Sequence, residues 1–205
     1  MMQDIPSILL AVVMWAYWGR VGAMSWRIRR RTRTLSGVVP EQGIERFLWL
    51  FFIPVVAAWL TLPIFAAIRS GGELALPEAA RTGPWMLVRG VASLATIALL
   101  ALTLRCWRRM GRQWKMAVTP GQRQVLITDG PFARVRHPIY GYQILLMLAS
   151  LVVVPTRPML LTAAIHLMLM TLKARNEERH LLGTHGDDYA RYVERTGRFF
   201  PRLAR

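Results

Sequence analysis

Five apolar runs, separated by polar segments, set the pattern of this chain. They cover residues 5–24, 44–68, 85–104, 139–154 and 159–172. The first three have 20 to 25 residues, the length of a helix that crosses a membrane, and the fourth has 16. The last run has only 14 residues, or about 21 Å of helix at 1.5 Å per residue. We therefore expect about five transmembrane helices, and the fifth should continue past Lys173 into water.

Composition supports a membrane protein. Apolar residues make up 54% of the 205 positions, the mean hydropathy is +0.30, and the apolar residues come in blocks, which is typical of transmembrane helices. The segment 155–158 contains two prolines and is short enough to make the last two helices an antiparallel hairpin. We predict an all-α integral membrane protein with a single domain over residues 1–205.

The net charge of +16 would suggest nucleic-acid binding in a soluble protein. Twenty-two of the 27 lysines and arginines, however, lie in three segments, which are residues 27–46, residues 105–136 and the part after residue 172. This alternation follows the positive-inside rule. It predicts a multi-pass protein of a bacterial inner membrane, with the N-terminus outside and segments 105–138 and 173–205 in the cytoplasm. We expect anionic lipid headgroups as partners and no nucleic acid.

Two further expectations follow from local composition. The dense arginines at positions 27–33 are expected to form a cationic loop after the first helix. Cys106 is the only cysteine, and neither His180 nor His185 has a partner at ligand spacing, so we expect no metal site. His166 lies within the fifth run and is expected to be a hydrogen-bonded bundle residue, with a proton relay or a haem ligand as the alternatives.

The segment 130–141 has the features of a shaped polar turn that leads into the fourth helix. Pro138 suits the first helical turn, and a residue before proline, here His137, is disfavoured in the helical region. Helix N-termini attract anions. Three backbone N–H groups are expected to be free for an anion, those of Ile139, Tyr140 and Gly141. The alternative is a positively charged helix end that binds nothing.

Two adjacent acids, Glu177 and Glu178, stand where the fifth helix should leave the membrane. The predicted topology places them on the same cytoplasmic face as the turn around His137. This arrangement favours a zwitterionic or cationic ligand, and the alternative is a solvated helix with charge pairs four residues apart.

These motifs together resemble the isoprenylcysteine carboxyl methyltransferase and phospholipid methyltransferase superfamily. The resemblance extends from about Gly111 to Pro201. Its residues are Gly111-Arg112-Gln113-Trp114, Leu126 to Phe132, Arg136-His137-Pro138-Ile139-Tyr140-Gly141, Glu177-Glu178 with Leu181, and Tyr189 with Tyr192.

The resemblance implies an integral-membrane methyltransferase that uses S-adenosyl-L-methionine. No Gly-x-Gly-x-x-Gly motif follows a strand, so a Rossmann site is excluded. The pocket is expected to be built from the segment before the fourth helix and from the C-terminal helix. His137 would bind the cofactor carboxylate and Glu177 its ammonium group. The implied cofactor-binding residues are Gln124, Val125, Leu126, Ile127, Phe132, Arg136, His137, Pro138, Ile139, Tyr140 and Glu177.

The implied substrate is a membrane lipid or a lipophilic small molecule at the cytoplasmic face. Lys173, with Arg175 close by, stands where the isoprenylcysteine enzymes carry an arginine for the substrate carboxylate, and Glu178 could accept a proton if the nucleophile is an amine. A phospholipid N-methyltransferase is the main alternative. A nicotinamide-dependent enzyme related to sterol reductases and a non-enzymatic haem or scaffold protein are weaker ones.

Overall fold

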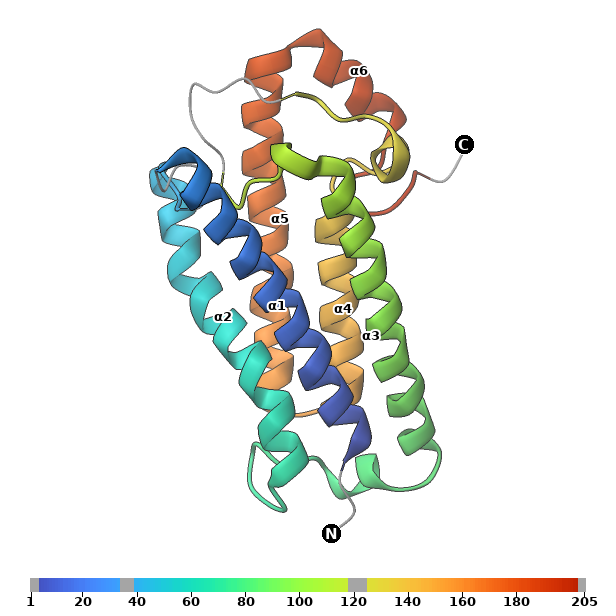
Figure 1. Cartoon of the computed structure of the whole chain (residues 1–205). Coiled ribbons are helices and arrows are strands. Elements are labelled where there is room, and N and C mark those ends of the chain that lie inside the picture. The colour runs from blue at the N-terminus through green and yellow to red at the C-terminus, as the bar shows by residue number, and fades with distance from the viewer. Residues whose placement is uncertain (1–3, 34–38, 118–124, 203–205) are drawn as a thin grey trace.

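The computed structural model describes residues 4–33, 39–117 and 125–202, and in these residues the chain forms helices and connecting segments without a named strand. Five long helices make an elongated bundle (Figure 1). The elements are α1 (Ile5–Thr32), α2 (Gly43–Ile68), η1 (Glu78–Arg81), α3 (Gly83–Met110), η2 (Gly111–Gln113), η3 (Gly130–Ala133), α4 (Pro138–Val153), α5 (Arg157–His185) and α6 (Asp187–Arg195).

Three of these helices are long and apolar enough to cross a membrane: α1, α2, and α3 together with η2. The helix α4 is apolar but shorter. The all-α membrane bundle predicted from the sequence is therefore confirmed. Within the bundle, α3 packs on α4, and α1 packs on both α2 and α3. The helix α5 packs on α2 and α4 and continues beyond them to carry α6 at one end (Figure 1).

The predicted cationic loop after the first apolar run is wrong, because α1 continues to Thr32 and takes most of these arginines with it. No proline or glycine interrupts the chain there, and cations in the last turn of a helix interact favourably with its dipole. The helix ends only at Arg33, which adopts a left-handed backbone conformation. The helix α5 continues through Lys173 to His185, as expected.

His166 is fully buried in the centre of the bundle. Its ring packs edge-on against Trp59, with 4.8 Å between ring centroids, and the Trp59 indole donates a hydrogen bond of 2.8 Å to Ser150. Neither ring nitrogen of His166 has a hydrogen-bond partner in the described residues. This packing supports the role of a bundle residue, although without the hydrogen bond that was expected.

Candidate functional site

The N-terminus of α4 is built as the sequence indicated. Pro138 opens the helix, and His137 before it has non-helical backbone angles, φ −124° and ψ 60°. The backbone N–H of His137 donates to the carbonyl of Arg198 at 2.9 Å, so the C-terminal segment runs beside this turn. The backbone N–H of Gly141, expected to be free for a ligand, donates instead to the His137 carbonyl at 3.0 Å. That expectation is wrong, because Gly141 already belongs to the first hydrogen-bonded turn of α4.

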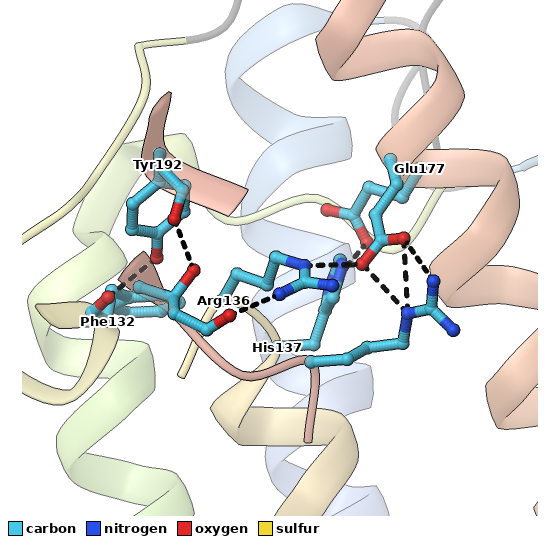
Figure 2. A network of polar contacts seen from close by, with 8 residues as sticks. Phe132, Arg136, His137, Glu177 and Tyr192 are labelled. Carbon is cyan, nitrogen blue, oxygen red and sulfur yellow. Dashed lines mark hydrogen bonds and ion pairs between the residues drawn. The ribbon is translucent and has the colours of Figure 1, made fainter. Parts of the chain in front are cut away.

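The structure brings His137 together with the two acids on α5 (Figure 2). His137 Nδ1 lies 3.6 Å from Glu177 Oε2, and Nε2 lies 3.4 Å from Glu178 Oε1. His137 is 5% exposed at its side chain, whereas Glu177 is 29% exposed. Residues that are 40 positions apart in the sequence thus form one polar cluster at the end of the bundle that carries α6.

Glu178 is the centre of this cluster. It accepts hydrogen bonds from Arg136 Nε at 2.7 Å and, through both oxygens, from the Arg198 guanidinium at 2.7–3.1 Å. Arg136 also donates to the carbonyl of Thr196 at 2.7 Å. Burial alone would raise the pKa of the Glu178 carboxyl, but contacts with His137, Arg198 and Arg136 outweigh burial and hold it well below its ordinary value.

Two predicted roles change as a result. A carboxylate bound by two guanidinium groups, with a lowered pKa, is a weak proton acceptor, so the role of general base expected for Glu178 is not supported. Arg136 was expected to contact the cofactor, but its guanidinium is used within the protein, on Glu178 and Thr196. Both residues fix the position of the turn that carries His137.

Glu177 and His137 differ from Glu178 and Arg136, because they still have polar atoms that could bind a ligand. His137 Nε2 is buried and makes no geometrically regular hydrogen bond within the described residues, although it lies 3.4 Å from Glu178 Oε1. The His137 ring stacks on Tyr140, with the ring planes within 6° of each other. A buried unpaired nitrogen beside a partly exposed carboxylate provides one donor and one acceptor, which suits the amino-acid end of a zwitterionic ligand.

A buried polar group from α2 completes the site. Asn176 on α5 donates to Gln42 Oε1 at 2.9 Å and to Glu45 Oε1 at 3.3 Å. Glu45 is 4% exposed although it lies at the start of an apolar helix. Sequence reasoning missed Glu45, because it treated the second span only as an apolar segment. An acidic residue inside such a run is itself a signal of function.

Lys173 lies one helical turn before Glu177 and is also buried. Its ammonium group donates to the carbonyl of Met116 at 3.3 Å and lies 5.3 Å from the centroid of the Phe52 ring. Burial lowers the pKa of Lys173, and the carboxylates of Glu45 and Glu177 act in the opposite direction. Lys173 lines a small inner cavity of about 60 Å³ together with Ile139 and Tyr140.

The other predicted site residues are less closely grouped. Phe132 is buried, and its carbonyl accepts a 2.6 Å hydrogen bond from Tyr192 on the far side of Arg136 from Glu177 (Figure 2). Val125 is 65% exposed, whereas Leu126 and Ile127 are half-buried. Arg175 is exposed, whereas Lys173 is buried. Gln124 lies outside the described residues.

The long apolar helices and the polar cluster at one end define an integral membrane protein with a candidate binding site at the end of its bundle. Residues 92–183 match the model of the isoprenylcysteine carboxyl methyltransferase (ICMT) family. The matched part runs from within α3 to the last turn of α5, and the match confirms the resemblance seen in the motifs.

Two curated relatives are similar to the chain. One is the nickel-cobalt-cadmium resistance protein NccN of Alcaligenes xylosoxydans xylosoxydans, 28% identical over 55% of this chain and 52% of its own length. The other is the cobalt-zinc-cadmium resistance protein CzcN of Cupriavidus metallidurans, 29% identical over 54% of this chain and 50% of its own length. The chain thus spans about half the length of the curated relatives it matches.

Proposed function

We propose that the protein is a membrane methyltransferase that uses S-adenosylmethionine and methylates a lipophilic acceptor at the cytoplasmic face of a bacterial inner membrane. The observation that carries the proposal is the pairing of His137 with Glu177 at 3.6 Å, with His137 Nε2 buried and without a hydrogen bond to any described residue. The match of residues 92–183 to the isoprenylcysteine carboxyl methyltransferase family model supports the same reaction class.

The residues present fit the amino-acid end of this cofactor. Glu177, partly exposed, would bind the ammonium group, while His137 Nε2 would donate to the carboxylate. The ring of Tyr140, stacked on His137, holds the imidazole in its orientation. When bound, the cofactor supplies an electrophilic methyl group on a sulfonium.

The state of Glu178 favours a carboxylate as the methyl acceptor. An amine must lose a proton on methylation, and Glu178, the acid that was expected to take it, is held ionised by Arg136 and Arg198. A carboxylate needs no base. Lys173, buried one turn before Glu177, provides a positive charge next to the inner cavity that would bind and orient such an acceptor.

An apolar groove indicates where the lipophilic part of the acceptor would lie. It has a volume of about 300 Å³ and a wholly apolar lining, which comes mainly from α2. It shares Trp18, Phe52 and Met116 with the inner cavity that contains Lys173. An apolar chain in this groove would therefore end close to Lys173.

The names of the two relatives refer to resistance to metal ions and do not specify a reaction. In residues 4–33, 39–117 and 125–202, no three His, Cys, Asp or Glu side chains are grouped so that they could hold a metal ion. The groups that the described site does offer are an imidazole and a carboxylate for an amino acid and an ammonium group for a carboxylate.

Calorimetric titration of the purified protein with S-adenosylhomocysteine tests the cofactor assignment. We expect saturable binding that is lost in Glu177→Ala, whereas Glu194→Ala, which removes an exposed acid on α6, should leave the affinity unchanged. Equal affinities of wild type and Glu177→Ala would refute the assignment.

A second assay identifies the acceptor. The protein is incubated with membrane lipids and S-adenosylmethionine labelled in its methyl group, and the labelled product is treated with mild alkali. A methyl ester releases its label as methanol under these conditions. Label that stays on an amine after this treatment would instead identify a phospholipid N-methyltransferase.

A further inference from the structure

A cleft of about 590 Å³ lies between the C-terminal halves of α1 and α3, at the end of the bundle that carries α6. We call it the arginine cleft, because six cationic side chains line it and no described lining residue is acidic. The cations are Arg20, Arg27, Arg31, Arg108, Arg112 and Lys115.

The spacing of these residues explains why they face one cleft. Arg20, Arg27 and Arg31 are seven and four residues apart, which places them on one side of α1. Arg108 and Arg112 are four residues apart at the end of α3 and in η2. None of these five arginines pairs with a carboxylate in the parts of the chain that the structure describes. Their mutual repulsion is therefore not relieved there by an acidic residue.

The cleft is also amphipathic. Met24, Ile28, Trp107 and Trp114 form part of its wall between the cations. Two membrane helices end here, and Arg20 lies deepest along α1. Tryptophan and arginine side chains at this position are typical of the headgroup level of a bilayer, where a ligand has both a charged and an apolar part.

We propose that the arginine cleft binds the phosphate headgroup of an anionic lipid. Guanidinium groups bind phosphate oxygens with two parallel hydrogen bonds, and a phosphodiester would relieve the repulsion among the arginines. The apolar wall suits the glycerol and the first carbons of the acyl chains. This site is distinct from the cluster of His137 and Glu177, although the cleft shares Trp107, Trp114 and Lys115 with the inner cavity.

The test uses the full chain in a non-ionic detergent, with bound lipids counted by native mass spectrometry. The probes are phosphatidylglycerol, phosphatidylcholine with the same acyl chains, and glycerol 1-phosphate, which has the anion without the chains. The double variant Arg27→Gln/Arg108→Gln removes one charge from each wall of the cleft. The control Arg29→Gln/Arg105→Gln removes the same charge from the same two helices outside the cleft.

We expect saturable binding of phosphatidylglycerol that is weakened at least about tenfold in the cleft variant and less than about twofold in the control. Phosphatidylcholine and glycerol 1-phosphate should bind more weakly than phosphatidylglycerol. Equal losses in the two double variants would overturn the proposal, because they would show attraction to the whole basic face. Equal binding of glycerol 1-phosphate would overturn the lipid assignment and identify a soluble phosphate ligand.

Two controls separate this site from the proposed methyl transfer. The unfolding temperature of each double variant shows that it is folded, and wild-type binding should weaken as salt is raised. Titration with S-adenosylhomocysteine should give the same affinity in the cleft variant and in wild type. Loss of that affinity with lipid binding unchanged would assign the arginine cleft to the cofactor and refute the lipid site.

Discussion

Each end of the bundle contains a buried arginine paired with a carboxylate, but the two networks differ in whether they are complete. At the end where the N-terminus lies (Figure 1), Arg89 is fully buried and donates to Asp4 at 2.6 Å, to Ser7, and to the carbonyls of Ala80 and Val153. Every nitrogen of this guanidinium has an acceptor, and together they join α1, η1, α3 and α4.

At the end that carries α6, Arg136 and Arg198 satisfy Glu178 in a similar way, but the neighbouring pair remains incomplete. Among the described residues His137 Nε2 has no hydrogen-bond partner, and Glu177 is 29% exposed. A buried polar atom without a partner costs free energy, and native proteins retain few such atoms. The complete network therefore indicates a structural role, whereas the incomplete one indicates the place where a ligand binds.

Arg89→Met should have the largest effect on stability. It leaves the largely buried carboxylate of Asp4 and two carbonyls without their donor, and removal of one partner of a buried pair costs about 3–5 kcal/mol. Thermal unfolding in detergent measures this loss. The affinity for S-adenosylhomocysteine of the folded fraction should not change. A loss below about 1 kcal/mol would show that the Arg89 network does not hold the helices together.

Glu178→Gln should cost less, about 2–3 kcal/mol, because hydrogen bonds to charged groups contribute about 1.5–3 kcal/mol each and the site is partly open to water. The ordinary pKa of this carboxyl is 4.5, and its contacts lower the pKa in the folded state. Its stabilisation is thus complete above about pH 4.5 and is lost as the pH falls below that value.

The measurement for Glu178 is the difference in unfolding temperature between wild type and Glu178→Gln at a series of pH values. The difference should be constant from pH 7 to about pH 5 and should shrink at lower pH. A difference that does not change with pH would mean that folding does not shift the pKa of Glu178. A wild-type stability that instead falls as the pH rises above about 4.5 would mean that Glu178 stays protonated in the folded protein, and would restore it as a candidate acid or base.

His137→Ala should affect ligand binding far more than stability. Within the described residues Nε2 makes no regular hydrogen bond, only a 3.4 Å contact with Glu178, whereas a hydrogen bond to a cofactor carboxylate contributes about 1.5–3 kcal/mol. Calorimetry with S-adenosylhomocysteine measures the affinity, and thermal unfolding measures the stability. A large loss of stability with unchanged affinity would reverse the comparison and give His137 a structural role like that of Arg89.

Gly141→Ala tests how the C-terminal segment is held against α4. A Cβ at this position would lie 2.3 Å from the Phe199 carbonyl oxygen, and such overpacking costs about 1–3 kcal/mol. Gly183→Ala is the matched control, because no described atom lies within 4 Å of a Cβ added at that helical glycine and alanine is the better helix former. Equal unfolding temperatures of the two variants would show that Phe199 does not contact α4 this closely.

Much of the fold was predictable from the sequence. The apolar runs locate the long helices, and Pro138 marks the start of α4, because both signals are local. The arginines after the first run were misassigned to a loop, since charge density says little about backbone conformation in a segment without proline or glycine. In the structure, helix α1 continues through these arginines to Thr32.

The site was predictable only in part. The motifs identify His137 and Glu177, and the topology places them on one face. The roles of Arg136, Glu178 and Arg198 depend on the path of the C-terminal segment, which pairs with residues 134–137 through backbone hydrogen bonds. No local pattern predicts such a contact between distant segments. The same reason explains why Glu45, from a helix near the N-terminus, was missed.

Arg175→Gln should have the smallest effect. It tests whether Arg175 and Lys173, which the sequence analysis assigned together to the substrate carboxylate, have different roles. Arg175 is exposed, whereas Lys173 two residues earlier is buried at the inner cavity. An exposed charge contributes less than about 0.5 kcal/mol to stability, and we expect kcat and KM for the methyl acceptor to stay unchanged.

Lys173→Gln should instead raise KM for a carboxylate acceptor about tenfold or more, because it removes a buried positive charge. If Arg175→Gln impaired turnover as much as Lys173→Gln did, the acceptor would have to reach the outer face of α5, and the inner cavity could not be its binding site.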